Sequence, residues 1–202
     1  MLKIKFLALT VISTLLAACG ASEEPAANAP VAQSLSAAGS AQLSSAFANV
    51  DQERLTNAES EPEQWLTYGG TYNEQRYSAL DQINTDNADQ LGLAWYHDIQ
   101  ANQGQQSTPL YVDGVLYLTE SWGQVNAIDA SSGETLWRFD PEVPGNVAGK
   151  DRCGVNNRGA AVYEGKVFVT AYDGRMFSLD AATGAVLWET QTVDDSLNYT
   201  ST

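Results

Sequence analysis

Residues 113–137, DGVLYLTESWGQVNAIDASSGETLW, are repeated with an offset of 51 positions as residues 164–188, EGKVFVTAYDGRMFSLDAATGAVLW. Both copies keep a first glycine, an Asp-Ala pair, a second glycine and a final Leu-Trp pair at matching positions. Repeats of about this length, made of short alternating strands, are typical of radial or stacked β arrays. The repeat therefore predicts an all-β fold assembled from similar blades.

Each copy contains a two-residue hairpin signal, Asp113-Gly114 in the first and Glu164-Gly165 in the second. An acidic residue followed by glycine, between alternating apolar residues, favours a tight β-turn. The second copy is expected to repeat the strands of the first. The strands expected in the first copy cover 109–112, 115–119, 124–129 and 135–139.

The second half of each copy combines an aspartate, a glycine and a tryptophan. The aspartate is expected to accept hydrogen bonds in a tight turn, and the glycine to supply a positive φ. The tryptophan is a wide, flat side chain suited to packing between adjacent sheets. These residues are Asp129, Gly133 and Trp137 in the first copy and Asp180, Gly184 and Trp188 in the second.

Two further elements are expected before the first copy. The polar cluster 84–87 is typical of a helix start and predicts a short helical turn through Leu91. Residues 93–99 then alternate like a strand that carries Trp95. Between the copies, the inserted loop 140–157 breaks the rhythm of the repeat.

The amino terminus has the composition of a lipoprotein signal peptide, predicted over residues 1–18. Two lysines precede an apolar run that is too short to span a bilayer. The run ends in LAACG, which resembles a bacterial lipobox and predicts lipidation of Cys19. The alternative is an ordinary signal peptide with an incidental cysteine. A lipid anchor would place the protein in the periplasm, with Gly20 favouring the outer membrane.

Residues 19–62 are predicted to form a flexible tether. They are rich in small and polar residues and contain few large apolar ones, so they cannot bury enough surface to offset the entropy of ordering. A weak helical stretch around 40–57 is one alternative within this range. The folded domain is expected to begin at residue 63.

Charge and residue usage exclude several classes of function. The chain carries 25 acidic and 10 basic residues, a formal charge of −15, so it repels phosphate backbones and is not expected to bind nucleic acid. His97 is the sole histidine, and Cys19 and Cys153 are the two cysteines. One histidine and two cysteines are too few for a zinc motif, and they allow no disulfide within the mature, lipidated chain.

The chain resembles the eight-bladed quinoprotein alcohol dehydrogenases, which depend on pyrroloquinoline quinone (PQQ). The resemblance rests on the ordered set WLTYGGTYNEQRYSALDQIN (65–84), LGLAW (91–95), FDPEVPG (139–145) and NRG (157–159), together with the repeat. It implies that residues 63–202 form the first blades of an incomplete eight-bladed propeller.

The resemblance also implies a set of cofactor-binding residues. Arg158 matches the family arginine that binds PQQ, and Thr202 matches a threonine that contacts it. Gln106 stands where the family usually has a glutamate that contacts the quinone. Arg152 and Cys153 stand where the family has two adjacent cysteines, so the vicinal disulfide is absent. Arg152 is then either a substitute contact for a PQQ carboxylate or a solvated loop residue.

The implied activity is the oxidation of a small alcohol in the periplasm, with PQQ and Ca²⁺ as cofactors. A cytochrome c or a membrane quinone would accept the electrons. The family's calcium ligands and catalytic aspartate would lie beyond Thr202, so we expect an amino-terminal fragment that is inactive alone, with no catalytic or metal-binding residue of its own. The alternative is a non-enzymatic propeller lipoprotein that acts as a scaffold in outer-membrane assembly, which Gln106 and the missing cysteine pair favour.

Overall fold

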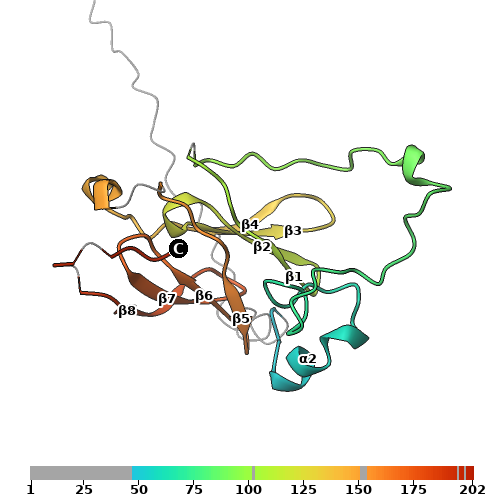
Figure 1. Cartoon of the computed structure of the whole chain (residues 1–202), viewed down its shortest axis with the longest axis horizontal. Coiled ribbons are helices and arrows are strands. Elements are labelled where there is room, and N and C mark those ends of the chain that lie inside the picture. The colour runs from blue at the N-terminus through green and yellow to red at the C-terminus, as the bar shows by residue number, and fades with distance from the viewer. Residues whose placement is uncertain (1–46, 102, 151–153, 195, 198) are drawn as a thin grey trace, which may run out of the picture. The chain divides into compact units, whose positions relative to one another are not determined.

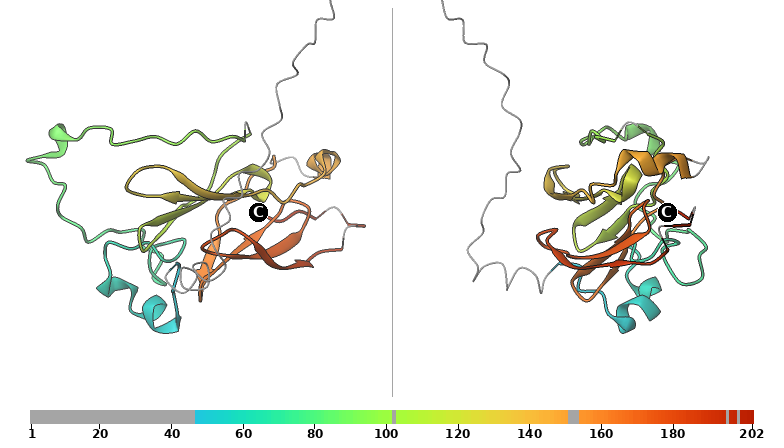
Figure 2. Two further views of the ribbon diagram at one scale, coloured as in Figure 1. Left: turned by 180° about the vertical axis from the view of Figure 1, so that it is seen from behind. Right: turned by 90° about the vertical axis from the view of Figure 1, so that its left-hand side faces the viewer.

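The computed structural model describes residues 47–101, 103–150, 154–194, 196–197 and 199–202 (Figure 1). These residues contain two four-stranded antiparallel sheets, each with its strands in sequence order. We call them blade 1 (β1–β4) and blade 2 (β5–β8). Figure 2 shows the two blades from two further directions. The all-β fold with propeller blades, predicted from the repeat, is confirmed.

The strands of blade 1 lie within one residue of the positions predicted from the sequence. Blade 1 contains β1 (Leu110–Val112), β2 (Val115–Thr119), β3 (Val125–Asp129) and β4 (Thr135–Phe139). Blade 2 contains β5 (Ala161–Tyr163), β6 (Lys166–Thr170), β7 (Arg175–Asp180) and β8 (Val186–Gln191). The helical elements are α2 (Gln52–Thr56) and the 3-10 turns η1 (Ala58–Ser60), η2 (Ala88–Gln90), η3 (Ser121–Gly123) and η4 (Gly145–Lys150).

The two predicted hairpin turns have the backbone that the sequence requires. Asp113 and Gly114 have φ angles of 51° and 88°, and Glu164 and Gly165 have φ angles of 46° and 71°. Two successive positive φ angles match the twist of the strands on either side, which is why short hairpins favour them. The turns therefore fix the register of β1 on β2 and of β5 on β6.

The aspartate-glycine turns also form as predicted. Asp129 Oδ1 accepts hydrogen bonds from the backbone N–H groups of Ser131 and Ser132, both at 2.9 Å. Hydrogen bonds from Ser131 and then Ser132 hold the pKa of Asp129 below its usual value. Asp180 makes the matching turn, in which it accepts from the N–H of Thr183 at 2.9 Å. Both turns therefore close on a carboxylate.

The tryptophan of blade 1 docks onto the turn of blade 2. Trp137 is 8% exposed, and its Nε1 donates a hydrogen bond to the Ala181 carbonyl at 2.9 Å. Its ring covers Gly184 so closely that a Cβ atom there would lie 2.6 Å from Cε3 of the indole. Phe139 and Phe177 extend the contact between the blades, with ring centroids 5.0 Å apart. This arrangement confirms the packing role predicted for Trp137.

Trp95 repeats this docking one step earlier in the chain. Its Nε1 donates to the Ala130 carbonyl at 3.0 Å, and a Cβ atom at Gly133 would lie 2.7 Å from its Cδ2. The strand predicted around Trp95 does not form. Residues 91–101 run as an extended arm in Figure 1, where Leu93 is 81% and Tyr96 73% exposed. The prediction fails because an alternating sequence becomes a strand only beside a neighbouring strand, and the described residues supply none there.

Trp188 also differs from its expectation. It is 41% exposed and meets Phe168 of its own blade, with ring centroids 6.0 Å apart. No third aspartate-glycine turn follows β8 among the described residues, so the indole has no such turn to cover. Among the described residues, Trp188 therefore does not dock between two sheets.

Residues 47–62 are folded, which corrects the expected boundary of the tether. Ala48 and Val50 are fully buried, and their carbonyls accept hydrogen bonds from the N–H groups of Gly165 and Glu164 at 2.9 and 2.8 Å. The composition does not reveal that this stretch is folded, because only two small apolar side chains pack beside the β5–β6 turn. Residues 19–46 of the predicted tether, and the predicted signal peptide with Cys19, lie outside the described residues.

One smaller expectation can also be compared with the structure. The polar cluster before Leu91 does precede a helical turn, η2, and within the cluster the side chain of Asn87 accepts from the N–H of Asn84 at 2.9 Å. No helix in the described part of the chain is long and apolar enough to cross a membrane.

The docking of Trp137 can be tested with a pair of glycine substitutions. Gly184→Ala and Gly114→Ala both place a side chain at positive φ, but the Cβ atom meets open space at Gly114 and the indole at Gly184. We expect Gly114→Ala to cost about 1–2 kcal/mol of unfolding free energy, and Gly184→Ala about 1–3 kcal/mol more from overpacking. Urea denaturation followed by circular dichroism measures both, and equal losses would contradict tight docking.

The turn carboxylate predicts a pH dependence. Because the folded protein lowers the pKa of Asp129, its contribution to stability is complete above the usual aspartate value of about 3.9 and is lost as the pH falls through the folded value. The wild type should therefore lose more stability between pH 7 and pH 3 than Asp129→Asn. Thermal unfolding at the two pH values gives the comparison, and parallel losses would show that the carboxylate has no such role.

Candidate functional site

Three consecutive buried polar residues lie at the end of blade 1 that is opposite its Asp113 and Asp129 turns. Thr119 is the last residue of β2, Glu120 and Ser121 follow it, and all three are at most 1% exposed. Buried polar groups are expensive unless they are hydrogen-bonded. Their hydrogen-bond partners lie in the irregular chain just before β1. The hydrogen-bonded pairs are Glu120 with Ala101 (2.9 Å), Ser121 with Gly104 (3.0 Å), Thr119 with Ser107 (2.9 Å), and Thr119 with Gln105. These contacts hold residues 103–108, the 103–108 segment, against the end of the blade.

A second irregular stretch, the 154–159 loop, is held at the same end of blade 2. Asn157 is 2% exposed and donates from Nδ2 to the Thr170 carbonyl at 2.8 Å, while its Oδ1 accepts from the N–H of Gly159 at 3.0 Å. Trp122 connects this loop to blade 1, because the backbone N–H of Trp122 donates to the Val155 carbonyl at 2.8 Å. The loop is therefore fixed from both blades.

The two stretches contain two of the four predicted cofactor residues, Gln106 and Arg158, and a third, Thr202, contacts Arg158. The Thr108 N–H donates to the Arg158 carbonyl at 3.1 Å, which joins the 103–108 segment to the 154–159 loop. The guanidinium of Arg158 donates to Thr202 Oγ1. Gln106 lies two residues from Thr108, and Gln106, Arg158 and Thr202 are all exposed. Cys153, with its neighbour Arg152, lies outside the described residues.

A tyrosine and a second arginine join this cluster, although the sequence motif that contains them assigned them no role. Arg76 lies over the ring of Tyr68, with Cζ 4.2 Å from the ring centroid. Its hydrogen bond is the main cause of a lowered pKa at Tyr68, followed by a hydrogen bond from Thr108, and the positive charge of Arg158 adds a smaller effect. Two guanidinium groups, those of Arg76 and Arg158, therefore act on Tyr68 in a strongly acidic chain.

The donors at this end suit a polar, negatively charged ligand. A guanidinium presents a planar fork of N–H groups that matches carboxylate oxygens. The hydroxyl of Thr202 and the amide of Gln106 both offer hydrogen bonds, and neither carries a charge that would repel an anion. Among the described residues, no cluster of three or more histidine, cysteine, aspartate or glutamate side chains is placed to hold a metal ion.

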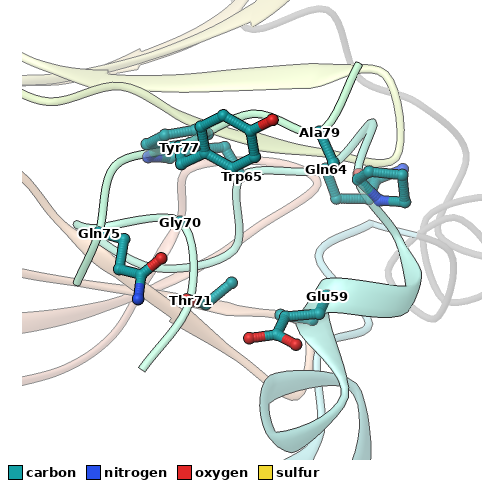
Figure 3. A pocket seen from close by; sticks show the side chains of 10 residues that line it. Glu59, Gln64, Trp65, Gly70, Thr71, Gln75, Tyr77 and Ala79 are labelled. Carbon is teal, nitrogen blue, oxygen red and sulfur yellow. The ribbon is translucent and has the colours of Figure 1, made fainter. Parts of the chain in front are cut away.

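A pocket of about 320 Å³ lies elsewhere, beside the 3-10 turn η1. Figure 3 shows Trp65 and Tyr77 on one side of it, with Glu59 and Thr71 on the other. The described residues that line this pocket do not include any of the predicted cofactor residues. The pocket and the Arg158 cluster therefore share no residue.

Comparison with known proteins places the chain in a family. Residues 65–193 match the model of the β-propeller domain of glucose/ethanol/alcohol dehydrogenases, the PQQ family. The chain belongs to this PQQ dehydrogenase family. The resemblance found in the sequence motifs is thereby confirmed.

Individual relatives agree with the family match. The dehydrogenase subunit of the alcohol dehydrogenase (quinone) of Komagataeibacter europaeus is 50% identical over 141 residues, which are 70% of this chain and 19% of that protein. The solved quinohemoprotein alcohol dehydrogenase ADH-IIG of Pseudomonas putida is 44% identical with a TM-score of 0.75, over 77% of this chain and 23% of that one. A europium-containing methanol dehydrogenase is 35% identical with a TM-score of 0.66, over 71% and 25% of the two chains. The chain spans about a fifth to a quarter of the length of these relatives.

The environment of Tyr68 gives a test of the cluster that needs no ligand. Arg76→Gln removes the main hydrogen bond that lowers the pKa of Tyr68, so this pKa should rise toward its usual value. Thr108→Val should raise it by less, because its hydrogen bond is the smaller contribution. Titration of ring-labelled tyrosine by NMR measures the shift. An unchanged pKa in Arg76→Gln would show that the two side chains do not interact in solution.

Proposed function

We propose that this chain forms the first blades of a PQQ-dependent dehydrogenase that oxidises a small alcohol. The observation that supports it best is the Arg158 cluster, in which the guanidinium contacts Thr202 beside the segment that carries Gln106. The family membership and the names of the relatives, which are alcohol and methanol dehydrogenases, support the same reaction.

The described residues fit PQQ chemically. PQQ carries three carboxylates and an ortho-quinone, so it needs several N–H and O–H donors. Arg158 supplies a fork for two of these oxygens, and the hydroxyl of Thr202 supplies a further donor. Gln106 replaces a glutamate of the family, and its amide donates where a carboxylate only accepts. The cluster is thus a set of donors for an anionic cofactor.

In the proposed mechanism, bound PQQ supplies a two-electron acceptor for the alcohol carbon. Arg158 and Thr202 bind its oxygens, and the 103–108 segment sets the position of Gln106 against it. Fixing the cofactor in one orientation lowers the entropic part of the barrier to the reaction. The metal ion, calcium or a lanthanide, and the catalytic base would be held by residues outside this chain, so the chain alone would be inactive.

The setting of the reaction is also a proposal. Cys19 would carry a lipid anchor after removal of residues 1–18, and would hold the domain on the periplasmic side of a bacterial membrane, by preference the outer one. The electrons would pass to a quinone, as the name of the Komagataeibacter relative states for that protein, or to a cytochrome c. The scaffold alternative makes no use of the Arg158 cluster.

Arg158 gives the direct test of the proposal. In the full-length protein that contains this chain, Arg158→Ala should weaken PQQ binding about 10- to 100-fold, because it removes a charge-assisted hydrogen bond worth about 1.5–3 kcal/mol. Lys166→Ala is a matched control, since it removes the same charge from the first residue of β6, at the other end of blade 2. Fluorescence titration with PQQ measures both affinities. A wild type that binds no PQQ would refute the proposal and favour the scaffold alternative.

A further inference from the structure

Glu120 is a fully buried carboxylate that the proposed function does not use. Its Oε1 accepts from Asn126 Nδ2 at 2.6 Å, and its Oε2 accepts from the Ala101 N–H at 2.9 Å. The guanidinium of Arg138 lies 3.5 Å from Oε2 and is itself held by Gln124 at 2.6 Å. Every one of these partners donates, as a carboxylate requires.

The repeat provides an internal comparison for this group. At the offset of 51 positions, Glu120 corresponds to Ala171, Asn126 to Phe177, and Arg138 to Glu189. In blade 2, Ala171 is fully buried and Phe177 is 2% exposed, and Phe177 is paired with Glu189 just as Asn126 is paired with Arg138. The blade fold therefore forms equally well with alanine and phenylalanine at these positions.

The buried charge must then have another reason in blade 1. Burying a carboxylate costs free energy, and replacing such a network by apolar side chains is often neutral or stabilising. What Ala171 lacks is an acceptor for the irregular chain that precedes the strand. Glu120 provides that acceptor for Ala101, two positions before the 103–108 segment begins.

We propose that Glu120 is a positioning residue that holds the start of the 103–108 segment and thereby places Gln106 in the cofactor site. The placement of Gln106 in a cofactor site rests on the proposed function, but the contact of Glu120 with Ala101 does not depend on that function. Thr119 and Ser121 hold the later part of the same segment through Ser107 and Gly104. Glu120 is the member of this trio that fixes the entry of the segment.

The experiment transplants the blade 2 residues into blade 1. The triple variant Glu120→Ala, Asn126→Phe, Arg138→Glu installs a set that already packs at the matching positions of blade 2, so the blade should remain folded while Ala101 loses its acceptor. Glu120→Gln is the conservative variant, because its Oε1 can still accept from Ala101 if the Asn126 amide turns over. Glu134→Gln, at the exposed turn of the same blade, is the control.

Two readouts are measured on the full-length protein. In the absence of PQQ, hydrogen exchange of peptides covering 101–108 should be at least about 10-fold faster in the triple variant, and that of the turn at 131–133 unchanged. The dissociation constant for PQQ should rise by a similar factor, with Glu120→Gln recovering most of the loss in both readouts. Glu134→Gln should match the wild type.

The outcomes separate this inference from the proposed function. Unchanged exchange over 101–108 in the triple variant overturns the inference, as does faster exchange with unchanged PQQ affinity. If the wild type itself binds no PQQ, the proposed function fails, and so does the assignment of Gln106 to a cofactor site, while the exchange data still decide whether Glu120 holds the segment. A loss of the whole fold in the triple variant would also overturn the inference, because the role of Glu120 would then be structural.

Discussion

The contact of Trp137 with the next blade is the constraint on which the rest of the described structure depends. One side chain supplies a hydrogen bond to Ala181 and a flat apolar face against Gly184. Because the indole fits only a turn without a side chain, it fixes both the distance and the orientation of blade 2. Trp95 makes the same contact with the turn after Asp129 in blade 1. Each of the two tryptophans therefore positions the aspartate-glycine turn of the next blade in the chain.

The two ends of the blades consequently have different tasks. The turn end joins the blades through backbone geometry and indole packing, and its residues are set by the repeat. The opposite end has irregular chain, whose backbone groups cannot pair with a neighbouring strand. Buried polar side chains such as Glu120 and Asn157 satisfy these groups, and in doing so they bring the 103–108 segment and the 154–159 loop together. The Arg158 cluster is a result of that requirement.

The sequence predicted the parts of the fold that depend on local chemistry. The hairpin at Asp113 and the turn at Asp129 depend on positive φ angles and nearby acceptors, which short motifs encode. The arm around Trp95 and the folded stretch around Val50 depend on whether a distant neighbour is present, which periodicity and composition do not show. For the site, motif resemblance indicated Arg158, but Glu120 became visible only when the structure showed that its carboxylate is buried.

The most direct test is a structure of the full-length protein with PQQ bound. Our account predicts that the cofactor lies at the end of the blades where β2 and β6 finish, with a carboxylate or quinone oxygen in contact with the Arg158 guanidinium and with Gln106 beside it. PQQ bound at another place, such as the pocket beside Trp65, would contradict the account. So would a protein that stays free of PQQ at saturating concentration.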